Sequence, residues 1–126
     1  MLHWKFAVIK DARLKEEIST LTRYSKVVKD AQVLIAVFLD HSLSYDRTKD
    51  AQAIGACIQN MLLLIHAVGL GAVWLGEILK NKDRVRELAG AADDHELMAV
   101  VAFGFPAENL VKGKRKALEQ AIICRK

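Results

Sequence analysis

The sequence has few of the residues that build metal clusters, disulfide frameworks or catalytic triads. It holds two cysteines, one proline and 6% aromatic residues in 126 positions, with a net charge of +4. Cys57 and Cys124 form no C-x-x-C pair, and the four histidines have no metal-ligand spacing, so we predict no metal site. No G-x-S-x-G segment marks a nucleophile, and so mild a charge gives little support for nucleic-acid binding.

What the sequence does have is apolar content, at 52% of its residues. That content and length predict one folded domain over residues 1–126 that needs no disulfide. Two unpaired cysteines suit a reducing, cytoplasmic compartment, and the first residues do not resemble a signal peptide. Residues 51–75 are apolar, but they contain glycines and the polar residues Gln59, Asn60 and His66, so we expect a buried central helix and no membrane association.

Apolar periodicity predicts three or four strands and as many helices, which indicates a mixed α+β or α/β layer structure. The expected strands are His3–Ile9, Gln32–Leu39, Ala72–Leu75 and Glu96–Phe105. The expected helices are Ala12–Thr22, Arg47–Val68 with Gly69 as its terminator, and a short helix that Asn81 caps and Gly90 ends.

Two segments are candidates for ligand contact. Gly76 and its neighbours offer backbone without a Cβ, so amide groups can approach a flat ligand, although a simple turn explains the spacing equally well. The basic tail contains Lys112, Lys114 and Arg115, which suit a phosphate, although a solvated charge run is the commoner explanation.

The long helix and the residues after it carry a resemblance to a known family. Residues 59–76 read QNMLLLIHAVGLGAVWLG, which resembles the nitroreductase family of flavin enzymes, with its Q-N pair, leucine run, A-x-G-L-G segment and W-I-G or P-x-E-G turn. Further pieces follow the family's order: HWKFAVI at 3–9, VREL at 85–88, MAVVAFGFP at 98–106 and RKALE at 115–119. The resemblance covers nearly the whole chain.

The resemblance implies an α+β fold with a mixed or antiparallel central sheet, flanked by helices around a long buried central helix. It also implies a homodimer with FMN at the interface, and ping-pong hydride transfer from NADH or NADPH to a nitroaromatic, quinone or similar acceptor. The backbone of Leu75, Gly76 and Glu77 would then face the flavin ring, and Arg115, helped by Lys112 or Lys114, would hold the FMN phosphate. Because the flavin does the chemistry, no side chain is assigned as catalytic.

The family pattern also has an earlier part, with an R-x-S-x-R segment, a helix or two and an S-x-x-N-x-Q-P-W approach to the first strand. This sequence starts about where that approach begins, so we expect an amino-terminally short domain. Losing those phosphate contacts would weaken flavin binding. The alternative is therefore a flavin-poor or flavin-free relative that acts as a binding or oligomerising module.

Overall fold

The computed structural model describes residues 2–107 and 113–125. Four strands form the sheet: β1 (Trp4–Ile9), β2 (Val33–Asp40), β3 (Gly71–Leu75) and β4 (His95–Gly104). The α-helices are α1 (Ala12–Ser19), α2 (Ser25–Asp30), α3 (Arg47–Ala67) and α4 (Lys82–Leu88). Two short 3-10 helices complete the elements within these described ranges, η1 (Glu77–Asn81) and η2 (Leu118–Ala121).

The strands form one open sheet in the order β1-β2-β4-β3, and every neighbouring pair is antiparallel. All four predicted strands are confirmed to within two residues at each end. The two long apolar runs, β2 and β4, are the central strands, and β2 buries six of its eight residues and β4 five of its ten, in line with their continuous hydrophobicity. The α+β class is confirmed, and the sheet is antiparallel.

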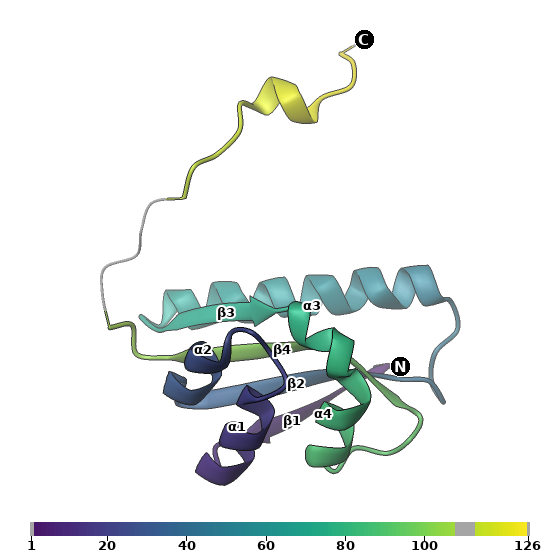
Figure 1. The fold of residues 1–126 in the computed structure, drawn as a ribbon. Coiled ribbons are helices and arrows are strands. Elements are labelled where there is room, and N and C mark those ends of the chain that lie inside the picture. The colour runs from purple at the N-terminus through teal and green to yellow at the C-terminus, as the bar shows by residue number, and fades with distance from the viewer. Residues whose placement is uncertain (1, 108–112, 126) are drawn as a thin grey trace.

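Helices cover the two faces of this sheet unequally (Figure 1). We call the face packed against α1, α2, η1 and α4 the closed face. Its core consists of Ile9, Ile18, Val28, Leu34, Ala36, Phe38, Leu75, Ile78, Val85, Leu97, Val100 and Ala102. We call the other face, which among the described residues is covered by α3 alone, the open face. Its smaller core consists of Val37, Leu39, Ile54, Ile58, Ile65, Ala99 and Val101.

Helix α3 has well-defined ends. Asp46 accepts a hydrogen bond from the Lys49 amide at 2.9 Å, and the buried Asp50 accepts one from the Ser44 hydroxyl. At the other end Gly69 has a φ of +83° and donates to the His66 carbonyl, which confirms the predicted glycine terminator.

The expectation that α3 is buried on most sides is wrong for the described residues. Only Asp50, Ile54, Ile58 and Ile65 are buried, while Leu63 and Leu64 are more than half exposed. The reason is that one sheet face covers only one side of a helix, and no second layer lies over α3 in the described parts of the chain. Among these parts no helix combines the length and apolarity needed to cross a membrane.

The segment between β1 and β2 also differs from the prediction. Helix α1 ends at Ser19, earlier than Thr22, because the hydroxyls of Ser19 and Thr20 donate to the carbonyls of Glu16 and Glu17 and compete with further helical turns. A tight turn follows, and then α2, which the sequence pattern did not reveal because only six residues form it.

The first strand is correctly placed, but its exposed face was not foreseen. Phe6 and Val8 are 46% and 63% exposed, whereas Ala7 and Ile9 contact the closed-face core. Since β1 is an edge strand and α3 does not cover it, alternation alone could not say which set of residues was buried.

Candidate functional site

The backbone turn that follows β3 is the first candidate site. Leu75 is buried and pairs with Val100 of β4, so the end of the strand is fixed. Gly76 is exposed, and a Cβ added to it would meet no atom within 4 Å. Its φ of −94° and ψ of −26° are open to any residue, so glycine is not required by the turn itself. What glycine provides here is bare backbone facing open space.

The carboxylate of Glu77, the residue after Gly76, is bound by other protein groups. Its Oε2 accepts hydrogen bonds from the Thr22 hydroxyl at 2.7 Å and the Arg23 amide at 3.3 Å, and its Oε1 contacts the Lys80 ammonium. The hydrogen bonds from Lys80 and Thr22 lower the pKa of Glu77 to about 2. Glu77 therefore offers a ligand its backbone, while its carboxylate is engaged by another part of the chain.

Exposed aromatic and apolar groups lie beside this turn. Trp74 and Val73, on β3, are each 43% exposed. The Cη2 atom of Trp74 lies 3.9 Å from the position that a Cβ on Gly55 would occupy, so the indole reaches α3 in ordinary van der Waals contact. The end of β3 thus combines an open backbone with an apolar border, which suits a flat, partly apolar ligand.

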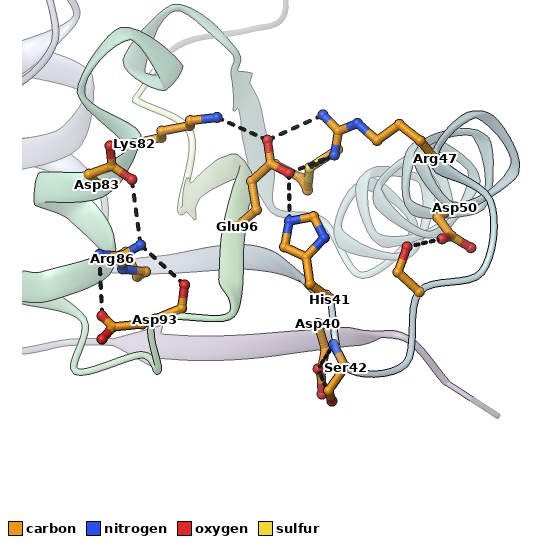
Figure 2. A network of polar contacts seen from close by, with 12 residues as sticks. Asp40, His41, Ser42, Arg47, Asp50, Lys82, Asp83, Arg86, Asp93 and Glu96 are labelled. Atoms are coloured by element: carbon orange, nitrogen blue, oxygen red, sulfur yellow. Dashed lines mark hydrogen bonds and ion pairs between the residues drawn. The ribbon is translucent and has the colours of Figure 1, made fainter.

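A polar network holds the helix that follows η1 (Figure 2). Glu96, near the start of β4, accepts hydrogen bonds from Arg47 at 2.6 Å and Lys82 at 3.0 Å, and His41 Nε2 lies 3.0 Å from the same carboxylate. Burial alone would raise the pKa of Glu96, yet the bonds from Lys82 and Arg47 lower it. The carboxylate ties the first residues of α3 and α4 to β4.

This network is one that sequence reasoning missed. Its members lie far apart in the chain, and each resembles an ordinary surface charge when considered alone. Only the partial burial of Glu96, whose side chain is 17% exposed, distinguishes it from a solvated ion pair. Its role is structural, because Arg47, Lys82 and the His41 ring are all turned toward the same protein carboxylate.

Three possible metal ligands also come together, although the sequence predicted no metal site. Side-chain atoms of Asp40, Asp94 and His95 lie within 4.8 Å of one another. The ammonium of Lys5 lies 3.6 Å from Asp40 Oδ2, and the Ser42 hydroxyl donates to the other oxygen. Because protein groups already contact both oxygens of the buried Asp40, we assign no ion to this cluster.

An apolar hollow runs along the open face between β1 and α3. One part, of about 490 Å³, is lined by Trp4, Ala53, Ala56, Cys57, Asn60, Met61 and Leu64. The adjoining part, of about 390 Å³, is lined by Trp4, Phe6, Val8, Ile35, Cys57 and Met61. Cys57 is half-buried at this hollow, and burial raises the pKa of its thiol.

The structure does not bring the basic tail to the turn after β3. Lys114 and Arg115 are exposed, and the segment 113–125 leads away from the sheet (Figure 1). Lys112 lies outside the described residues. Of the six predicted site residues, the structure therefore places Leu75, Gly76 and Glu77 together, and the assignment of the basic residues to a phosphate stays a prediction.

Comparisons with known proteins agree with this fold. The chain is 37% identical over 109 residues to a protein of Methanothermobacter thermautotrophicus named as an NADH dehydrogenase/NAD(P)H nitroreductase. A nitroreductase from Desulfovibrio desulfuricans, solved in complex with FMN, matches 98% of this chain and 72% of its own at 37% identity and a TM-score of 0.90. An NAD(P)H nitroreductase structure from Bacteroides thetaiotaomicron covers 98% of this chain and 72% of its own, at 26% identity and a TM-score of 0.85.

The relatives are longer than this chain. The match covers 84% of this chain but 56% of the Methanothermobacter protein. The family model described as the nitroreductase family matches residues 4–105, which includes all four strands, α3 and the turn at Gly76. By sequence and by fold, the chain belongs to the nitroreductase family.

Proposed function

We propose that this chain acts as an FMN-dependent NAD(P)H oxidoreductase of the nitroreductase type. The observation that carries the proposal is the exposed Gly76 turn, where a Cβ would meet no atom within 4 Å. Family membership and the FMN complex of the Desulfovibrio relative support it. We propose a ping-pong reaction, in which NADH or NADPH donates first and a nitroaromatic, quinone or similar acceptor is reduced second.

The residues present fit the ring system of FMN. The backbone of Leu75, Gly76 and Glu77 would lie along one edge of the ring, and the exposed Trp74 provides apolar contact nearby. When bound, FMN supplies hydride acceptance and hydride donation. The role of the chain is to bind and orient the ring, and no side-chain acid or base is needed for that role.

We propose that the FMN phosphate is held by Arg115, with help from Lys112 or Lys114. A guanidinium forms charge-assisted, bidentate hydrogen bonds with phosphate, which favours Arg115 as the main contact. Because the tail leads away from its own sheet, it is available to reach a site on a second copy of the chain.

We also propose a homodimer. Leu63 and Leu64 on α3, and Val68 directly after it, are each 58% to 65% exposed, and the apolar hollow adjoins this helix. Apolar surface of this kind on one side of a single helix favours burial against a further layer. The exposed Leu118 and Ile123 on the tail are further apolar groups that a second copy would cover.

The visible absorption spectrum of the purified protein, before and after addition of FMN and desalting, is the first test. We expect a retained flavin spectrum and oxidation of NADH or NADPH when an acceptor is added. A colourless protein that refuses FMN would overturn the proposal and favour a flavin-free binding or oligomerising module.

The variant Arg115→Ala tests the phosphate contact. A hydrogen bond to a charged group contributes roughly 1.5–3 kcal/mol, so we expect FMN binding to weaken by about 10- to 150-fold with the melting temperature unchanged. Lys126→Ala removes a positive charge from the same end of the chain and is the matched control. Equal FMN affinity in Arg115→Ala and the parent would refute this assignment.

A further inference from the structure

The open turn at Gly76 is tied to a distant part of the chain by two side chains of η1. Glu77 receives the Thr22 hydroxyl at 2.7 Å and the Arg23 amide at 3.3 Å, across more than 50 positions of sequence. At the other end of η1, Asn81 Nδ2 donates to the Leu21 carbonyl at 2.7 Å. Asn81 was expected to cap α4 with its side chain, and this bond explains why it forms no such cap.

The Thr22 hydroxyl forms one hydrogen bond as a donor and another as an acceptor. The residue is 7% exposed, its hydroxyl donates to Glu77, and the same oxygen accepts from the Tyr24 amide at 3.2 Å. A buried hydroxyl with both a donor and an acceptor bond is held in one orientation. It therefore fixes the position of the Glu77 carboxylate relative to the turn between α1 and α2.

The backbone of the Gly76 turn has few restraints of its own, so contacts with another segment matter for its position. Gly76 has ordinary right-handed dihedral angles, and no atom lies within 4 Å of its Cβ position, so neither special geometry nor packing on that side holds it. Leu75 fixes the turn from the strand side by burial. On the other side, the Gly76 carbonyl accepts a hydrogen bond from the Leu79 amide at 3.2 Å, which restrains the peptide only within η1 itself. The bonds of Glu77 to Thr22 and the Arg23 amide are what join this peptide to the turn between α1 and α2.

We propose that Glu77 is a positioning residue: its carboxylate, held by Thr22 and the Arg23 amide, fixes the Gly76–Glu77 peptide at the geometry that the FMN ring needs. This inference rests on the proposed function. Glu77 then acts on the ring through the backbone, and Thr22 acts through Glu77. The low pKa of Glu77 keeps the carboxylate ionised throughout the neutral range, so this restraint does not change between pH 5 and 9.

The test compares Thr22→Val, Thr22→Ser and Glu77→Ala in the full chain. Valine keeps the shape of threonine and removes the hydroxyl, whereas serine keeps the hydroxyl. The matched control is Thr20→Val, because the Thr20 hydroxyl lies in the same turn but is exposed and donates to Glu17. For each protein we would measure the FMN dissociation constant, the flavin midpoint potential and the melting temperature.

We expect Thr22→Val and Glu77→Ala to weaken FMN binding roughly tenfold and to shift the flavin potential, with Thr22→Ser and Thr20→Val close to the parent. If the melting temperature of Thr22→Val and Glu77→Ala falls while FMN affinity and potential stay at the parent values, the residues are merely structural and the inference is wrong. If Thr22→Val does not fold, Glu77→Gln replaces it, since it keeps the size of the side chain. Failure of the parent itself to bind FMN would instead refute the proposed function, and the inference with it.

Discussion

The two faces of the sheet differ in how completely this chain covers them. The closed face is packed by three helices and η1, and its core residues from Ile9 to Ala102 are at most 4% exposed. The open face has one helix, a smaller core, and exposed Phe6, Val8 and Leu64 along its border. The closed face therefore contributes most of the buried core of the domain, whereas the open face leaves apolar side chains uncovered in this chain.

The candidate site lies where these two regions meet. Leu75 and Ile78 are part of the closed-face core, while Val73 and Trp74 on the same strand and turn are exposed. A ligand bound at Gly76 would therefore contact a backbone whose neighbours Leu75 and Ile78 are fixed in the closed-face core. This placement suits a group that must be held rigidly while its other side stays accessible.

The largest expected effect is a loss of folding stability on substitution in the closed-face core. Leu34 lies on β2 and is fully buried in the closed-face core. We expect Leu34→Ala to lower the free energy of unfolding by about 2–5 kcal/mol. The matched substitution Leu64→Ala on the open face removes the same atoms from a side chain that is 65% exposed, and we expect a change within about 0.5 kcal/mol in the monomer. Chemical denaturation of both variants measures the contrast, and equal losses would show that the two faces do not differ.

A smaller effect is expected on self-association. Leu64→Glu places a charge on the apolar side of α3, and because a buried leucine contributes about 1.5–3 kcal/mol, the dimer dissociation constant should rise at least tenfold. Gln52→Glu adds the same charge at an exposed polar position of the same helix and is the control. Sedimentation equilibrium measures both; an unchanged association state for Leu64→Glu would exclude this side of α3 from the interface.

The smallest expected effect concerns acid stability at the boundary between the faces. The folded-state pKa of Glu77 is about 2, below its ordinary value of 4.5, so its contribution is complete above about pH 4.5 and is lost as the pH falls toward 2. The difference in melting temperature between the parent and Glu77→Gln should therefore be constant at neutral pH and shrink over that acid range. Differences that stay constant down to pH 2 would contradict this.

The sequence predicted the four strands, α3 and the Gly76 turn because each has a strong local signal. Continuous apolar runs in β2 and β4 need burial on both faces, and Gly69 marks the end of α3 through its backbone preference. It could not predict α2, which is too short for a periodic pattern. Nor could it predict that the Asn81 side chain donates to the distant Leu21 carbonyl and does not cap α4.

The roles of the charged residues were also hidden in the sequence, because they depend on contacts between distant segments. Glu77 and Glu96 are both glutamates beside an apolar residue, and neither stands out in the sequence. Glu77 accepts from Thr22, 55 positions away, whereas Glu96 joins α3 and α4 to β4 through Arg47, 49 positions away, and Lys82, 14 positions away. Such partners come together only through the antiparallel pairing of strands, which local patterns do not encode.

By itself, then, the sequence determined the class of fold, the central strands and the family, because hydrophobic periodicity and glycine positions act locally and are repeated in order along the chain. The tertiary structure decided which side of β1 and α3 is left uncovered, and which carboxylates are restrained. Burial and long-range hydrogen bonds are properties of the packed layers, so they exist only once β1, β2, β4 and β3 lie side by side.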